Sequence, residues 1–178
     1  MEQKSVIEIR NSYNIPNSPI IYYWCFHEAC ISILLSKLSD QINYDKISQI
    51  VNLNNGEIYW LLYIGKGKKG NERLKKYHIL DSNNFHQTGI ENGRLSSLRT
   101  TLCGLLDLPM SKSKKEIDDF IDENCIVQWA VCKLEELDTL EENLIKSNYL
   151  PLNYQNTKGI LTKKHRKILR NCKSQMRK

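Results

Sequence analysis

The stretch "LLYIGKGKKGNERLKKYH" at residues 61–78 decides which fold the sequence predicts. It opens with an apolar, strand-forming run, passes through a loop of glycine and lysine, and continues as the start of a basic helix. A strand, a glycine loop and a helix in this order bring backbone N–H groups and a helix N-terminus to a phosphate. The stretch therefore predicts a phosphate-binding site, and the first question is which kind of phosphate it binds.

The glycine loop does not satisfy the nucleotide-binding motifs. Its sequence "GKGKKG" at 65–70 matches G-x-G-x-x-G, but a Rossmann unit also needs a long helix and an acidic residue about 20 positions later. Here the helix is short, and the acidic residue near that distance, Glu91, lies in a polar loop expected at 81–94. A Walker A motif fails because Asn71 and Glu72 stand where Lys and Ser/Thr are required. The lysines of the loop are better suited to contact a phosphodiester backbone. The hypothesis of a nucleotide-binding regulator depends on this motif alone.

Composition predicts a folded protein of one domain. The 178 residues are enough to bury a core, and 40% of them are hydrophobic with charges of both signs between them. No signal peptide and no apolar run of membrane-spanning length is present, so we expect a cytoplasmic protein with no membrane partner. The six cysteines show no C-x-x-C pair and no zinc-finger spacing, which favours buried, reduced thiols over a metal site or disulfides.

The net charge of +6 is concentrated at one end of the chain. From Lys158 to Lys178 every charged side chain is basic, whereas the acidic excess lies earlier, in "EIDDFIDEN" and "LEELDTLEEN". A cationic surface of this kind suits a nucleic acid or an anionic lipid. A solvated basic tail explains the same pattern equally well.

Hydrophobic periodicity predicts alternating strands and helices. We expect strands over residues 19–26, 57–65 and 125–134, and helices over residues 27–42, 71–80, 95–106, 111–124, 138–148 and 162–178. This order predicts a mixed α/β (α+β) layout with a small sheet and helices around it.

A series of residues spread along the chain forms an ordered pattern. Its members are Tyr22, Tyr63, Ile64, Gly65, Lys66, Arg73, Tyr77, Glu141, Pro151 and Asn153. In this order they resemble the GIY-YIG nuclease superfamily, in which a Tyr-Ile-Gly strand precedes a helix with an arginine, and a later helix carries a glutamate before a closing Pro-x-Asn. The helix "SSLRTTLCGLL" also resembles one found in a bacterial subgroup of single-domain members. The similarity covers residues 20 to 175.

Two features depart from the family pattern. The leading Gly-Ile-Tyr appears as Ile-Ile-Tyr, ending at Tyr22. Tyr59 is the other candidate for this tyrosine, but it would share a strand with Tyr63, whereas the family places its two tyrosines on adjacent paired strands. The family commonly joins these strands by a short hairpin, whereas 41 positions separate Tyr22 from Tyr63 here. This spacing indicates an insertion at about 25–56, which its sequence predicts to be mainly helical and where specificity contacts or a dimer surface are expected.

The resemblance implies a mainly antiparallel central sheet flanked by helices, and hydrolysis of DNA phosphodiester bonds. This reaction needs an activated water, charge stabilisation at the phosphate and help for the leaving oxygen. By resemblance, Glu141 would hold Mg²⁺, which Mn²⁺ is expected to replace, and Arg73 would stabilise charge on the phosphoryl oxygens. Tyr22 would be the general base or would position the water. A tyrosine with its usual pKa near 10 is a poor base at pH 7, so this role requires a nearby cation such as Lys66. The remaining catalytic residues implied are Tyr63, Tyr77 and Asn153.

Each of these residues also has an ordinary structural explanation. Asp138 and Glu141 have the spacing of a capping box, and Tyr22 and Tyr63 are common strand aromatics. Arg73 suits a solvated helix surface, and Asn153 suits a turn beside Pro151.

The favoured function is a restriction-type, sequence-specific DNA endonuclease without a nucleotide cofactor. The whole chain, 1–178, is expected to form one domain with an N-terminal extension at 1–19 and a basic helix at 158–178. A repair or homing nuclease and a non-catalytic nucleic-acid-binding module are the alternatives.

A protein with one active site per chain can cut both DNA strands in three ways. It forms a homodimer, it moves to the second strand after the first cut, or it makes two separate nicks. The cations expected to contact DNA are Lys68, Lys69, Lys75, Lys76, Arg99, Lys163, Lys164 and Arg166.

Overall fold

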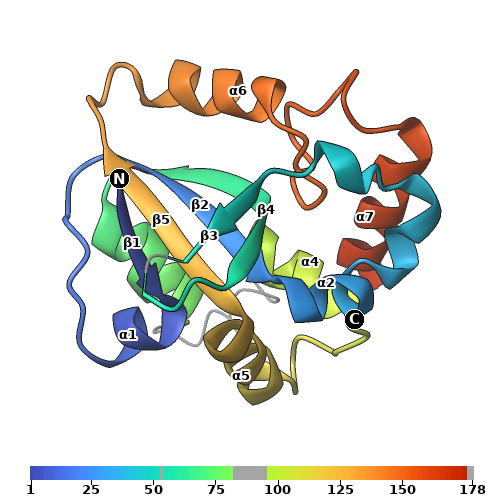
Figure 1. Ribbon diagram of the computed structural model, residues 1–178, viewed down its shortest axis with the longest axis horizontal. Helices are drawn as coiled ribbons and strands as arrows, with labels where there is room; N and C mark the ends of the chain where they lie inside the picture. Colours follow the sequence, from blue (N-terminus) through green and yellow to red (C-terminus); the bar gives the residue numbers. More distant parts are fainter. Residues whose placement is uncertain (53, 82–95, 176–178) are drawn as a thin grey trace.

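Five antiparallel strands form one sheet, in the order β1-β5-β2-β4-β3, in the computed structural model (Figure 1). The structure describes residues 1–52, 54–81 and 96–175. The strands are β1 (Glu2–Ser5), β2 (Ile20–His27), β3 (Gln49–Val51), β4 (Ile58–Gly67) and β5 (Cys125–Val131). The central strand β2 pairs with β4 on one side and with β5 on the other, which confirms the predicted antiparallel α+β fold.

Helices cover both faces of this sheet (Figure 1). They are α1 (Val6–Asn11), α2 (Glu28–Leu34), the 3₁₀ helices η1 (Ser36–Gln41) and η2 (Tyr44–Lys46), the π-type helix η3 (Asn71–Ile79), α4 (Ser97–Leu105), α5 (Lys114–Asn124), α6 (Leu137–Ser147) and α7 (Lys163–Gln175). Alternate residues of β2 enter two separate hydrophobic clusters, as expected for a strand covered on both faces. Ile21 joins Leu137 and Ile145 of α6, whereas Tyr22 and Trp24 join the larger cluster formed with the other helices.

The first residues of the chain complete the sheet, although the sequence predicted only an extension there. β1 pairs with β5 from Glu2 opposite Trp129 to Ser5 opposite Ile126, and so forms an edge of the sheet. Helix α1 then begins at a capping box, in which Ser5 N donates to a carboxylate oxygen of Glu8 at 2.9 Å.

The insertion between β2 and β4 is mainly helical, as predicted, but it also adds a strand. It begins after His27 because β2 continues to that residue. The single helix expected at 27–42 is divided into α2 and η1, which end at Leu34 and Gln41. Strand β3 then pairs with β4 and forms the opposite edge of the sheet.

Helices α4 and α7 pack closely, because Gly104 has no side chain. A Cβ atom at Gly104 would lie 2.6 Å from the Cβ of Cys172, far inside van der Waals contact. This close approach fixes the position of α7, whose first turn is capped by Thr162, since its Oγ1 accepts from His165 N at 3.0 Å.

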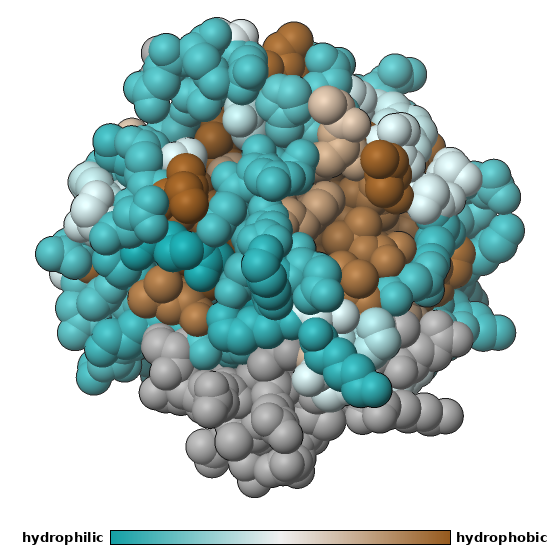
Figure 2. Space-filling model, turned by 90° about the horizontal axis from the view of Figure 1, so that it is seen from below, coloured by the Kyte–Doolittle hydropathy of each residue, from teal (hydrophilic) through white to brown (hydrophobic). Residues whose placement is uncertain are grey.

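Hydrophilic side chains cover most of the face seen in Figure 2, and apolar side chains gather in a few patches on it. Within the described ranges, no helix is long and apolar enough to cross a bilayer. Five of the six cysteines are buried, free thiols. From residue 82 onward, the polar loop predicted at 81–94 lies outside the described residues, as do Glu91 and the first residue of the helix predicted at 95–106.

Candidate active site

Tyr22 and Tyr63 lie on the adjacent strands β2 and β4, as the family pattern implied. Tyr22 is paired with Gly65 and Trp24 with Tyr63, and cross-strand partners project from the same face of a sheet. The Cβ of any other residue at position 65 would lie 2.7 Å from the Cε2, Cζ and hydroxyl oxygen atoms of Tyr22. The glycine of the Tyr-Ile-Gly motif therefore makes room for the Tyr22 side chain. Tyr59 also lies in β4, but its side chain packs in the smaller cluster on the opposite face.

The glycine and lysine segment is less of a loop than its sequence predicts. β4 continues to Gly67, which is paired with Ile20, and η3 begins at Asn71. Gly70 N then donates to Ser18 O at 2.9 Å, so the short connection is tied to the residues that precede β2. Pairing with β2 supplies the hydrogen bonds of this segment, and it therefore forms strand rather than an open phosphate loop.

His78 holds the Tyr22 hydroxyl in place inside the protein. Its Nε2 lies 2.8 Å from the Tyr22 hydroxyl oxygen, and its Nδ1 lies 2.7 Å from Ser96 Oγ, which also accepts from Arg99 N at 3.2 Å. Burial, together with the charges of Arg73 and Arg99, lowers the pKa of His78 well below its usual value near 6.5. A neutral imidazole accepts through one nitrogen and donates through the other. We assign the proton to Nδ1, so that Tyr22 donates to Nε2.

Arg73 is the cation that faces the tyrosines. Its guanidinium carbon lies 4.4 Å from the centroid of the Tyr77 ring, and its side chain hydrogen-bonds to Tyr22. Burial raises the pKa of Tyr63 to about 12 and that of Tyr22 further, although Arg73 acts in the opposite direction on both. The phenol of Tyr22 is therefore protonated at neutral pH. The sequence predicted that a cation such as Lys66 lies near Tyr22, and in the structure the cation that acts on Tyr22 is Arg73.

Lys66 pairs with two carboxylates at the start of α6. Its Nζ lies 2.6 Å from Glu141 Oε2 and 2.9 Å from Asp138 Oδ1. Burial lowers the pKa of Lys66, but hydrogen bonds to the two carboxylates raise it more. The capping-box explanation is wrong, because α6 has Glu136 at its N-cap and no side-chain capping bond. Asp138 and Glu141 instead face the strand that carries Lys66.

Glu141 is the residue of this site that could hold a divalent metal ion. In the described part of the chain, no group of three or more His, Cys, Asp or Glu side chains converges on one point, so a zinc-type cage is not formed there. The Glu141 side chain is only 16% exposed and lines the cavity described below. A single carboxylate completed by water and substrate phosphate oxygens is a normal site for Mg²⁺, so the donor set fits this ion.

Asn153 holds strand β4 in position next to Tyr63. Its Nδ2 donates to Ile64 O at 2.8 Å, and its Oδ1 accepts from Ile64 N at 2.9 Å. Both backbone groups between Tyr63 and Gly65 are thus satisfied by one buried amide, and Leu152 N donates to Leu62 O beside it at 3.1 Å. These contacts give Asn153 a structural role, because they hold β4 at Ile64, between Tyr63 and Gly65.

One cavity of about 840 Å³ brings together the predicted catalytic residues from β2, β4, η3 and α6. The predicted site residues that line it are Tyr22, Tyr63, Lys66, Lys68, Lys69, Arg73, Lys76, Tyr77 and Glu141. An adjoining cavity of about 330 Å³ also reaches Tyr63 and Glu141, and Asn153 lines this second one.

The other cations predicted to contact DNA lie elsewhere. The prediction is wrong for Arg99, whose side chain is 2% exposed and bonds to Asp118 at 2.8 Å. Lys75 Nζ donates to Tyr13 O at 2.7 Å, and Lys75 does not line either cavity. Lys163, Lys164 and Arg166 are in the first turns of α7, outside both cavities.

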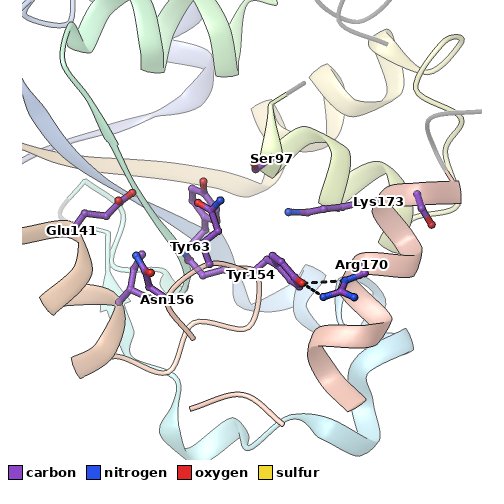
Figure 3. A pocket seen from close by; sticks show the side chains of 11 residues that line it. Tyr63, Ser97, Glu141, Tyr154, Asn156, Arg170 and Lys173 are labelled. Atoms are coloured by element: carbon purple, nitrogen blue, oxygen red, sulfur yellow. Dashed lines mark hydrogen bonds between the residues drawn. The ribbon is translucent and has the colours of Figure 1, made fainter. Parts of the chain in front are cut away.

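Sequence reasoning missed several residues of the second cavity. Tyr154, Asn156, Arg170 and Lys173 line it, and none of them was predicted as a site residue (Figure 3). His78 was also missed. The spacing of Arg170 and Lys173, three residues apart on one basic helix, was the available signal for this pair.

Comparison with known protein families matches most of the chain. A family model described as "GIY-YIG catalytic domain" matches residues 20–175 of the chain. The comparisons with curated proteins and with solved structures gave no match.

Proposed function

The chain belongs to the GIY-YIG catalytic domain family, a family of nucleases, and from this premise we propose that it is a Mg²⁺-dependent, restriction-type DNA endonuclease. The observation that carries the proposal is the convergence of Tyr22, Arg73 and Glu141, from three separate elements, on one cavity.

Arg73 is suited to bind the phosphate that is cleaved. Its guanidinium is held between the Tyr77 ring and the Tyr22 hydroxyl, so its direction is set before a substrate arrives. A guanidinium keeps its charge at neutral pH and donates two parallel hydrogen bonds to phosphate oxygens.

Glu141 would hold the Mg²⁺ ion. When bound, the metal supplies charge stabilisation for the leaving 3′ oxygen. Lys66 adds a positive charge beside the same carboxylate, with its Nζ 2.6 Å from Glu141 Oε2. It is therefore placed to bind a phosphate oxygen or the attacking water at the same end of the cavity.

Tyr22 would position the attacking water rather than remove its proton as a phenolate. Burial keeps its hydroxyl protonated, and in the tautomer assigned above this O–H donates a hydrogen bond to Nε2 of His78, 2.8 Å away. Arg73 donates to one lone pair of the oxygen, and the other lone pair can accept a hydrogen bond from water in the cavity that Tyr22 lines. His78 thus orients Tyr22, and Tyr22 orients the water.

The test compares cleavage by the wild type with cleavage by Glu141→Gln and Arg73→Gln, on plasmid and phage DNA, with Mg²⁺ or with EDTA. Glu142→Gln is the matched control, because Glu142 is the next residue of α6 but pairs with Lys146 at 2.6 Å and lines neither cavity. We expect Mg²⁺-dependent cleavage that the two site variants lose and the control retains. Discrete bands would indicate sequence specificity and a smear would indicate its absence, whereas full cleavage by both site variants would refute the proposal.

A non-catalytic nucleic-acid-binding module is the second candidate. The observation that favours it is the Lys66 ammonium, which already engages both Glu141 and Asp138. It predicts salt-sensitive binding of DNA with no cleavage under any metal condition. A wild type that shifts DNA on a gel and never cuts it would favour this alternative.

A further inference from the structure

The second cavity continues from the catalytic one. The two cavities share Tyr63, Ser97, Glu141, Gln155 and Asn156 as lining residues. Figure 3 shows Glu141 and Tyr63 at one end, and Arg170 and Lys173 at the other. Because the two cavities share these residues, a chain molecule that lies over Glu141 can extend into the second cavity.

Two cations are held at the far end of this cavity. Arg170 Nε donates to the Tyr154 hydroxyl at 3.0 Å, and a second guanidinium nitrogen bonds to the same oxygen (Figure 3). The Arg170 guanidinium and Lys173 Nζ lie 5.5 Å and 5.6 Å from the centroid of the Tyr154 ring. One aromatic side chain thus fixes the place of two positive charges on α7.

The charge of Arg170 is not neutralised by an acidic side chain in the described part of the chain, where it forms no salt bridge. This distinguishes it from Lys66 and Arg99, which are both paired with carboxylates. The carboxylate that lines the second cavity, Glu141, is at its opposite end (Figure 3). A guanidinium that has no acidic partner among the described residues is a favourable place for an anion such as a phosphate.

The remaining lining residues suit a nucleotide rather than a simple anion. Gln155 and Asn156 have side-chain amides, which both donate and accept hydrogen bonds and can contact a base edge. The Tyr154 ring offers an aromatic surface in the same cavity.

We propose that the second cavity binds the nucleotide next to the cleaved bond, with its phosphate at Arg170 and Lys173. This inference rests on the proposed nuclease function, because the strand that reaches Glu141 is the strand that enters the cavity. Contacts to a neighbouring phosphate set the register of a strand. Arg170 and Lys173 therefore determine which phosphodiester bond lies at Arg73.

The experiment measures binding of a short fluorescein-labelled DNA duplex by anisotropy, in EDTA so that no strand is cut. The variant is Arg170→Ala/Lys173→Ala. The comparison variant is Lys158→Ala/Lys167→Ala, which removes the same charge from exposed positions of the same basic segment, outside both cavities and outside the predicted DNA contacts. We expect the first pair to raise Kd about tenfold or more and to reduce the salt slope by about one, and the second pair to raise Kd by about threefold at most.

Equal losses of affinity in the two pairs would overturn the inference, because they would show general attraction to a basic segment. Complete displacement of the duplex by an excess of nucleoside monophosphate would also overturn it, by assigning the cavity to a free nucleotide. Thermal unfolding checks that the variants fold. If the alanine pair unfolds early, Arg170→Gln at this exposed position makes the same comparison.

Cleavage in Mg²⁺ separates this inference from the proposed function. If the wild type cuts DNA and the Arg170→Ala/Lys173→Ala pair binds and cuts at the same positions with the same kcat/KM, only the cavity assignment fails. If the wild type binds but never cuts, the nuclease function fails, and the anisotropy comparison still decides whether the cavity takes DNA.

Discussion

Replacing His78 by glutamine should make the stability of the protein less sensitive to acid. His78 is fully buried, with Tyr22, Trp24 and Tyr77 as ring neighbours at 5.4, 6.4 and 5.3 Å between centroids. Its polar partners are Tyr22 and Ser96. A proton on this ring would have to displace one of these hydrogen bonds in a fully buried site.

The sign of the effect follows from the depressed pKa. Burial first, and then the charges of Arg73 and Arg99, keep His78 neutral in the folded protein below its usual pKa near 6.5. The unfolded chain takes up a proton as the pH falls through that value, so it binds more protons than the folded protein. Stability therefore falls with falling pH, and the contribution of His78 is complete above about pH 6.5. Between about pH 7 and pH 5.5, one such histidine costs about 1.3 kcal/mol of unfolding free energy.

The assay is urea unfolding of the wild type and His78→Gln at these two pH values. The loss of stability between them should be smaller in the variant by about 1.3 kcal/mol, with unchanged m-values. Burial also lowers the pKa of His165, which therefore adds to the acid sensitivity of both proteins, but its contribution cancels in the difference. Equal acid sensitivity in the two proteins would show that His78 is not held neutral, and would refute the assigned hydrogen bonds of Tyr22.

Three further substitutions test Tyr22 and the residues that hold β4 beside it. Gly65→Ala should lower the unfolding free energy by about 1–3 kcal/mol and abolish cleavage, since its Cβ would displace Tyr22; a stable and active variant, by thermal unfolding and plasmid cleavage, would contradict this. Tyr22→Phe should reduce the cleavage rate by about a hundredfold or more with the fold retained, and an unchanged rate would remove Tyr22 from the mechanism. Asn153→Ala leaves the N–H and C=O of Ile64 without their partner, so urea unfolding should show a loss of about 2–4 kcal/mol, whereas a loss of activity alone would indicate a direct role.

The sequence by itself determined the three strands of the sheet that carry the fold, and most of the candidate catalytic set. β2, β4 and β5 are recognisable because a strand buried on both faces needs apolar side chains at nearly every position. The spacing of Tyr63, Arg73 and Glu141 identified the family because each chemical role needs its residue at one place on its element. Both properties depend on the order and identity of residues along the chain, so they can be read without knowing which residues are in contact.

Only the tertiary structure decided which polar residues reach the site. β1 has a polar sequence, and only its pairing with β5, more than a hundred residues away, makes it a strand. Arg99 is turned inward by Asp118, and His78 meets Tyr22 across 56 positions of sequence. Arg170 is brought to the second cavity by the packing of α7 on α4. A basic side chain has the same local pattern whether it is buried in an ion pair, solvated or aimed into a cavity, and the difference depends on partners that are distant in the sequence.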